Sequence, residues 1–209
     1  MILSIVIPVY NSEPFVLECL DSIIYQLTQE TEVIIVDDAS SDNSLSLVKE
    51  YLESLDYSIK KLIHVISLKE NHGVGFARKV AIEKSVGEYI ASIDPDDLIS
   101  ETYVKDILKI IVNSTPDILQ FQISRFYKDK KDKHIISSHF LEEGLHHIDE
   151  NIRKKFYEQS FWSFCTRIIR RELFADIDFS PLRNCEDVYA LPLILLKAKT
   201  IYILDNDYY

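Results

Sequence analysis

The sequence predicts an α/β protein built on a mostly parallel sheet flanked by helices. Short apolar runs alternate along the chain with segments whose apolar residues recur at helical spacing. The runs at 2–8, 32–36 and 88–93 are largely apolar, which is typical of strands buried on both faces. Polar residues follow each of these runs, and open α/β sheets bind ligands at the carboxyl ends of their strands.

The alternation is regular through the first half of the chain. We expect strands at 2–8, 32–36, 62–68 and 88–93, and helices at 13–27, 43–55, 76–85 and 101–112. Ser12 is the expected cap of the first helix, and Pro14 suits its first turn. Strands and helices alternating at this spacing predict right-handed βαβ units.

The pattern changes character near residue 115. Strands are expected at 117–123 and 201–204, and helices at 149–159 and 186–196. The charged run 128–133 is interpreted as a solvated hairpin tip, whereas 161–171 mixes aromatic residues with arginines. We therefore predict one domain over 1–209 with two lobes, 1–114 and 115–209.

Composition excludes several classes of protein. The 209 residues are 47% apolar and 27% charged, as in an ordinary globular domain, and the formal net charge of -11 argues against a nucleic-acid partner. No apolar run approaches the roughly 20 residues of a membrane span, and the N-terminus lacks the basic region of a signal peptide. Three widely spaced cysteines predict neither a disulfide framework nor a zinc site and fit a reducing cytoplasm.

An acidic turn follows the expected strand at 88–93. Pro95 interrupts the strand, so Asp94, Asp96 and Asp97 are presented at its carboxyl end. Three carboxylates this close repel one another unless water or a cation lies among them. Carboxylate oxygens suit Mg²⁺ and Mn²⁺, but Asp and Pro are also common in solvated turns. The turn alone leaves both interpretations open.

Phosphate-binding glycine loops are excluded. The chain contains four glycines, and the residues after the first expected strand are Val9-Tyr10-Asn11-Ser12. Neither a Walker loop nor a dinucleotide-binding fingerprint can be placed there.

Six motifs occur in order along nearly the whole chain. They are Ser4-Ile5-Val6-Ile7-Pro8-Val9-Tyr10-Asn11, Val36-Asp37-Asp38-Ala39-Ser40-Ser41-Asp42, Asn71-His72-Gly73-Val74-Gly75-Phe76-Ala77-Arg78, Gly87-Glu88-Tyr89-Ile90, Asp94-Pro95-Asp96-Asp97 and Glu186-Asp187. In this order and spacing they resemble the inverting family-two glycosyltransferases. The resemblance implies the nucleotide-diphosphosugar transferase (GT-A) fold, with a nucleotide-sugar-binding lobe followed by an acceptor-binding lobe.

The resemblance implies a set of donor-binding residues. These are Pro8, Val9, Tyr10, Asn11, Asp37, Asp38, Asn71, Gly73, Arg78, Asp94 and Asp96. Pro8, Val9 and Tyr10 would line the nucleobase pocket, and Asp38 would accept a hydrogen bond from a uracil-type ring. Helix capping or turn formation is the alternative for Asp37 and Asp38. Arg78 would meet the diphosphate or pair with Asp94, and Lys79 departs from the asparagine common in the family.

The resemblance also implies a divalent ion and a general base. Mn²⁺ or Mg²⁺ would bind the acidic turn, with Asp96 the preferred ligand, then Asp94, and Asp97 either a ligand or an orienting group. An inverting displacement needs a carboxylate that takes the acceptor hydroxyl's proton. Asp187 is the predicted base and Glu186 the group that positions or contacts the acceptor, although acids at a helix N-terminus also complement its dipole.

The acceptor side is expected to include Trp162, which would stack on a sugar ring or pack in the core. The resemblance implies a UDP-sugar donor and a carbohydrate or lipid-linked glycan acceptor, in cell-surface polysaccharide synthesis. The enzyme would work in the cytoplasm, with peripheral contact to the inner face of the membrane. A sugar nucleotidyltransferase and a non-catalytic nucleotide-sugar-binding module are the alternatives.

Overall fold

The structure is a computed structural model that describes residues 1–125, 134–136 and 140–209. The charged run 128–133, predicted as a hairpin tip, lies outside the described residues.

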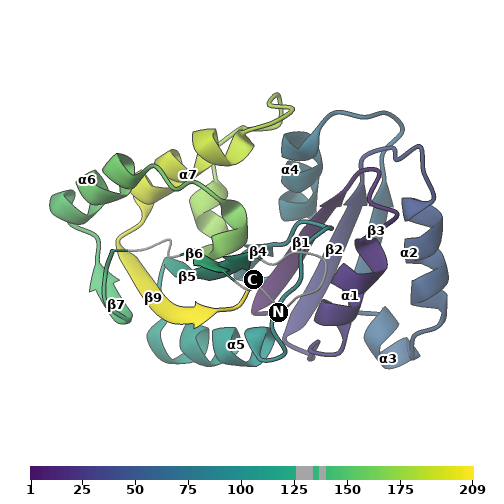
Figure 1. Ribbon diagram of the computed structural model, residues 1–209, viewed down its shortest axis with the longest axis horizontal. Coiled ribbons are helices and arrows are strands. Elements are labelled where there is room, and N and C mark those ends of the chain that lie inside the picture. Colours follow the sequence, from purple (N-terminus) through teal and green to yellow (C-terminus); the bar gives the residue numbers. More distant parts are fainter. Residues whose placement is uncertain (126–133, 137–139) are drawn as a thin grey trace.

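The first half of the chain forms parallel βαβ units, as predicted (Figure 1). Its elements are β1 (Leu3–Val9), α1 (Val16–Ile24), β2 (Thr31–Asp37), α2 (Ser44–Glu53), α3 (Tyr57–Lys60), β3 (Ile63–Ser67), α4 (Val74–Lys84), β4 (Tyr89–Ser92) and α5 (Tyr103–Ser114). Strand β1 lies between β2 and β4 and is parallel to both, and β3 extends the sheet parallel to β2. The carboxyl ends of these four strands therefore meet at one edge of the sheet.

The second half continues the same sheet with mixed strand directions. Its elements are β5 (Ile118–Arg125), β6 (His134–Ile136), β7 (Gly144–His147), α6 (Glu150–Gln159), the 3₁₀ turn η1 (Phe164–Thr166), β8 (Arg167–Arg170), the 3₁₀ turn η2 (Arg171–Phe174), α7 (Glu186–Lys197) and β9 (Thr200–Asp207). The order is β3-β2-β1-β4-β8-β5-β9-β7, with β6 also paired to β5. Strand β8 is antiparallel to both β4 and β5, so it joins the two halves.

Helices cover both faces of this mixed α/β sheet. Alternate residues of β1 point to opposite faces: Ile5 and Ile7 join one buried cluster, and Val6 joins the other. The first cluster includes residues from α1, α2 and α5, and the second includes residues from α4, α6 and α7. In Figure 1, α4 and α7 accordingly lie above the sheet and α5 lies below it.

Three sequence-based expectations were wrong: the start of α1, the cap by Ser12 and the absence of a strand at 167–170. Helix α1 begins at Val16 rather than at Glu13, because the carboxylate of Glu13 instead accepts bonds from the backbone and side-chain nitrogens of Asn43. Ser12 does not cap the helix through its side chain; its hydroxyl donates to the carbonyl of Tyr10. Strand β8 was not predicted, because it begins with a buried arginine, Arg167, that hides the apolar pattern of a strand.

Among the described helices, none is both long and apolar enough to cross a lipid bilayer.

Candidate functional site

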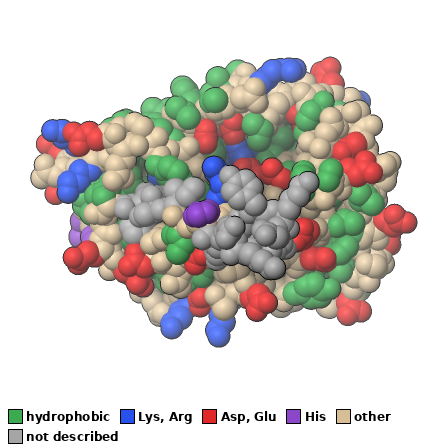
Figure 2. Space-filling view, viewed as in Figure 1, with side chains coloured by type: hydrophobic (Ala, Val, Ile, Leu, Met, Phe, Trp, Pro, Cys, Tyr) green, Lys and Arg blue, Asp and Glu red, His purple; other side chains and the backbone are tan. Residues whose placement is uncertain are grey.

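A cavity of about 710 Å³ opens at the carboxyl ends of β1, β2 and β4. Figure 2 shows a hollow in this face of the molecule, with acidic and basic side chains below its rim. The lining residues are Pro8, Val9, Tyr10, Asn11, Ser12, Phe15, Asp38, Asn71, Gly73, Val74, Ala77, Arg78, Asp94, Pro95, Asp96, Ser163, Phe164, Cys165, Arg183, Asn184, Cys185, Glu186 and Asp187. The cavity thus brings together residues from both halves of the chain.

One end of the cavity carries exposed aromatic rings. Tyr10 follows β1 and is 48% exposed, and Phe15 is 51% exposed. Asn11 adopts a left-handed conformation and binds the 40–41 turn: its amide donates to Ser40 and its side-chain oxygen accepts from the backbone amide of Ser41. The loop is therefore anchored while the ring of Tyr10 is available to a planar ligand.

The Asp38 carboxylate organises the loop before α4. One oxygen accepts from the backbone amide of His72 at 2.9 Å; the other accepts from the backbone amide of Gly73 at 2.7 Å and from the side chain of Asn71 at 2.8 Å. Asp38 is 2% exposed and lines the cavity. Its carboxylate already accepts hydrogen bonds from three donors of the 71–73 loop, so in this structure its role is to hold that loop in place.

Two glycines allow the segment before α7 to pack against the start of α4. A Cβ added at Gly75 would lie 2.3 Å from the carbonyl oxygen of Leu182, and one at Gly73 would lie 2.6 Å from the Cα of Arg183. Gly73 also has φ +95°, which disfavours other residues. Lys79, which departs from the family pattern, donates to the carbonyl of Ile177 in the same segment.

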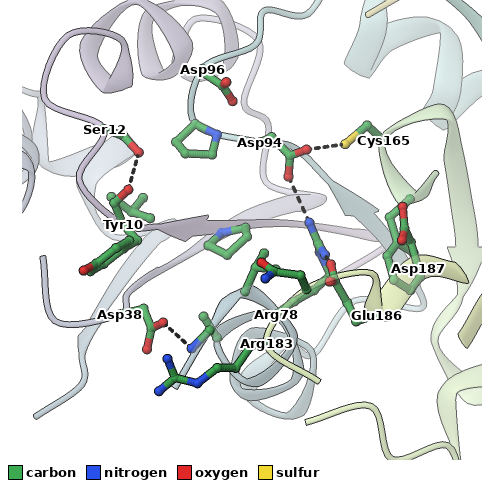
Figure 3. Close-up of a pocket in the computed structure, with 18 of the residues that line it drawn as sticks. Tyr10, Ser12, Asp38, Arg78, Asp94, Asp96, Cys165, Arg183, Glu186 and Asp187 are labelled. Carbon is green, nitrogen blue, oxygen red and sulfur yellow. Dashed lines mark hydrogen bonds and ion pairs between the residues drawn. The ribbon is translucent and has the colours of Figure 1, made fainter. Parts of the chain in front are cut away.

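Arg78 lies at the centre of the polar network (Figure 3). Its Nη2 is 2.9 Å from Oδ1 of Asp94, its Nε donates to Oγ of Ser92 at 2.9 Å, and its Nη1 pairs with the carboxylate of Glu186. The guanidinium carbon also lies 5.1 Å from the ring centroid of Phe164. Because Arg78 is 3% exposed, this buried cation ties the acidic turn to the start of α7.

The acidic turn is held on its inner side. Asp94 accepts from Arg78 on one oxygen and from Sγ of Cys165, at 3.0 Å, on the other. Burial and the charge of Asp94 raise the pKa of Cys165 well above its usual value, so the thiol is protonated and can donate. Asp96, in contrast, is exposed at the cavity, and its side chain makes no hydrogen bond or ion pair with the described part of the chain.

The same turn concentrates negative charge. Burial raises the pKa of Asp97 to about 6, a hydrogen bond from Tyr209 opposes the rise, and the charges of Asp96 and Asp94 add to it. Ligand atoms of Asp94, Asp97 and Cys165 lie within 4.8 Å of one another. Oxygen ligands on a turn with this excess of charge fit a hard divalent cation, and Asp96 has its carboxylate free.

The two acidic residues at the start of α7 have different surroundings. Glu186 is 4% exposed and its carboxylate is paired with Arg78. Asp187 is partly exposed, and its carboxylate accepts a hydrogen bond from the adjacent backbone amide of Val188, at 2.8 Å. Burial lowers the pKa of Arg167 to about 10, and the charge of Asp187 opposes this shift. Asp187 is thus the more available carboxylate of the pair.

Three predicted site residues do not line the cavity. Asp37 is buried and accepts hydrogen bonds from the backbone amide of Ser40 and the hydroxyl of Ser67. Asp97 is partly buried within the acidic turn, and Trp162 packs edge-on against Tyr157 with ring centroids 5.4 Å apart. The remaining predicted donor residues and the acidic pair do line it.

Sequence reasoning missed several cavity residues. They include Phe15, Cys165, Arg183 and Cys185. Arg183 donates to the carbonyl of Asn71 at 3.0 Å, a contact between residues 112 positions apart. In the sequence, the only indication that Arg183 belongs to the site was its position three residues before the acidic pair.

Comparison with known proteins gives consistent relatives. The chain is 27% identical over 218 residues to glycosyltransferase GlyG of Streptococcus pneumoniae, covering 99% of this chain and 69% of GlyG. It is 29% identical over 212 residues to the poly(ribitol-phosphate) beta-N-acetylglucosaminyltransferase TarS of Staphylococcus aureus, covering 99% of this chain but 35% of TarS.

A solved structure of TarS residues 1-349 in complex with UDP-GlcNAc matches with a TM-score of 0.80 and 28% identity. The match covers 100% of this chain and 58% of the solved one, so the chain spans little more than half of that structure. The model of the family described as "Glycosyl transferase family 2" matches residues 4–178. With that match over most of its length and the shared GT-A architecture, the chain belongs to glycosyltransferase family 2.

Proposed function

We propose that this protein is a metal-dependent, inverting glycosyltransferase that moves a sugar from a UDP-sugar to a carbohydrate or lipid-linked glycan acceptor. The observation that carries the proposal is one cavity with an exposed aromatic end, an acidic turn and a partly exposed carboxylate, Asp187, on its far wall. TarS is solved with UDP-GlcNAc and is named for transfer to poly(ribitol-phosphate), which supports a UDP-sugar donor and a cell-surface glycan.

The donor would lie along the cavity from the aromatic end to the acidic turn. Tyr10 offers its ring to the base, and the backbone of the 71–73 loop, held by Asp38, shapes the wall beside it. Asp38 would contact the base only with the lone pairs that its three loop donors leave free. The diphosphate would then reach the acidic turn.

A divalent cation would be held by Asp96, with Asp94 next, and Asp97 would orient the turn. When bound, the ion offsets the charge that develops on the departing nucleoside diphosphate. Arg78 holds the side chain of Asp94 in place, because its guanidinium pairs with that carboxylate at 2.9 Å.

Asp187 would serve as the general base. The acceptor oxygen attacks the anomeric carbon, the bond from that carbon to the diphosphate oxygen breaks, and the acceptor's proton passes to Asp187. The adjacent amide of Val188 donates a hydrogen bond to its carboxylate, and the charge of Arg167 lies nearby. Glu186, paired with Arg78, would position the start of α7 rather than take the proton.

Replacement of Asp187 by Asn tests this assignment. We expect Asp187→Asn to bind UDP with Mn²⁺ as the wild type does and to lose at least about 100-fold in sugar transfer, the lower range for removal of a general base. Thermal-shift screening of UDP-, GDP- and dTDP-sugars with Mn²⁺ selects the donor for the assay. Transfer at the wild-type rate would refute the role of Asp187. Binding without hydrolysis or transfer in the wild type would favour a binding module.

The cytoplasm and the inner face of the membrane are the proposed places of work, because a nucleotide-sugar donor and a lipid-linked acceptor would meet there.

A further inference from the structure

Tyr209 reaches the acidic turn from the end of the described chain. Its hydroxyl oxygen accepts a hydrogen bond from the backbone amide of Asp94 at 2.9 Å, across 115 positions of sequence. Its own backbone carbonyl accepts from the amide of Ser124 at 2.7 Å, which fixes the residue beside β5. The hydroxyl is therefore placed behind the turn by contacts with two separate parts of the sheet.

The hydroxyl therefore holds the backbone of Asp94, the first residue of the Asp94–Asp97 turn. A phenol oxygen has lone pairs that can accept such a bond from an amide.

We infer that the Tyr209 hydroxyl is a positioning group that holds the backbone of Asp94, and with it the acidic turn, in the arrangement required for cation binding. The inference rests on the proposed function for its metal. Tyr209 does not line the cavity, so it acts through the turn and not on the substrate.

One physical effect supports this role. Without the hydroxyl, the partly buried amide of Asp94 loses its hydrogen-bond partner, and an amide left without one is costly. The loss loosens the backbone of the turn, while Arg78 and Cys165 still hold the side chain of Asp94.

The neighbouring residue provides a matched control. Tyr208 is buried, and its hydroxyl donates to Asp106 at 3.1 Å and accepts from Asn206 at 2.9 Å, away from the acidic turn. Tyr209→Phe and Tyr208→Phe each remove one hydrogen-bonded hydroxyl and keep the ring.

Amide hydrogen exchange measures, without any ligand, how strongly the Tyr209 hydroxyl protects the backbone amide of Asp94. We expect exchange of the Asp94 amide to accelerate about tenfold in Tyr209→Phe, the factor that corresponds to one lost hydrogen bond, and to stay unchanged in Tyr208→Phe. Calorimetric titration of Mn²⁺ into protein with UDP measures the consequence. There, Tyr209→Phe should weaken the apparent Mn²⁺ affinity about tenfold, and Tyr208→Phe should leave it unchanged.

The outcomes separate this inference from the proposed function. Unchanged exchange of the Asp94 amide in Tyr209→Phe would show that the hydroxyl does not hold this amide, and would overturn the inference. Faster exchange with wild-type Mn²⁺ affinity would show that the hydroxyl supports the loop but does not position the ion's ligands, and would overturn the inference. Equal loss of affinity in Tyr208→Phe would do the same. If the wild-type protein binds no UDP with Mn²⁺, the proposed function fails, and the metal role inferred for Tyr209 fails with it.

Discussion

Replacing Arg78 by Met removes the cation that joins the acidic turn to α7. The side chains of Arg78 and Glu186 are 4% and 5% exposed, so Arg78→Met leaves the Glu186 carboxylate buried without its partner. Breaking a buried ion pair from one side costs about 3–5 kcal/mol of unfolding free energy. For a chain of this size the melting temperature should fall by roughly 6–20 °C.

A double-mutant cycle identifies the cause. Glu186→Gln keeps the shape of the side chain and removes its charge, so adding it to Arg78→Met should recover part of the loss. We expect a coupling free energy of about 2 kcal/mol, within the range for residues in direct contact. Urea unfolding of the wild type, both single variants and the double variant supplies the four free energies.

An exposed ion pair serves as the control. Lys60 and Glu53 lie 2.7 Å apart, but their side chains are 38% and 75% exposed. Lys60→Met should cost less than about 1 kcal/mol. The reasoning is refuted if Arg78→Met is no more destabilising than Lys60→Met, or if the Arg78 and Glu186 effects add within about 0.5 kcal/mol.

Three further predictions concern the walls of the cavity. Gly75→Ala should lower the melting temperature and weaken UDP binding, because its Cβ would meet the Leu182 carbonyl at 2.3 Å; calorimetry showing wild-type affinity would contradict this. A maleimide should label Cys185, the exposed one of the three cysteines, and UDP with Mn²⁺ should slow the reaction; mass spectrometry finding equal rates would place the ligand elsewhere. Asp38→Asn places an amide NH₂ where a carboxylate oxygen accepts hydrogen bonds from the 71–73 loop, so the loop should shift and UDP affinity should fall about tenfold. An unchanged affinity would show that Asp38 does not contribute to the site.

The sequence predicted the parallel half of the sheet because its strands are short, largely apolar runs separated by helical patterns. Polar residues that follow β1, β2 and β4, among them Asn11, Asp38 and Asp96, meet in one cavity, since parallel strands place their carboxyl ends together. Arg78 was predicted to meet either Asp94 or the ligand. The structure shows the pair with Asp94 and adds Glu186, which no local pattern could indicate because it lies 108 positions further on.

Two features were beyond local patterns. Strand β8 contains Arg167, whose guanidinium can be buried because it donates hydrogen bonds to the side chain of Gln120 and to the carbonyls of Phe161 and Ser163. These hydrogen bonds form between residues brought together by the fold, so no periodic pattern in the sequence indicates that this arginine belongs to a buried strand. Tyr209 likewise reaches the acidic turn only once β9 has paired with β5.

Calorimetric titration of UDP into the wild type and Asp96→Ala, each with and without Mn²⁺, tests the central claim most directly. If the acidic turn holds a cation that binds the donor's diphosphate, UDP binding by the wild type should require Mn²⁺. Asp96→Ala should lower the affinity for UDP at least about tenfold, the loss expected when one charge-assisted contact is removed. Binding of equal strength without Mn²⁺, or wild-type affinity in Asp96→Ala, would contradict the account.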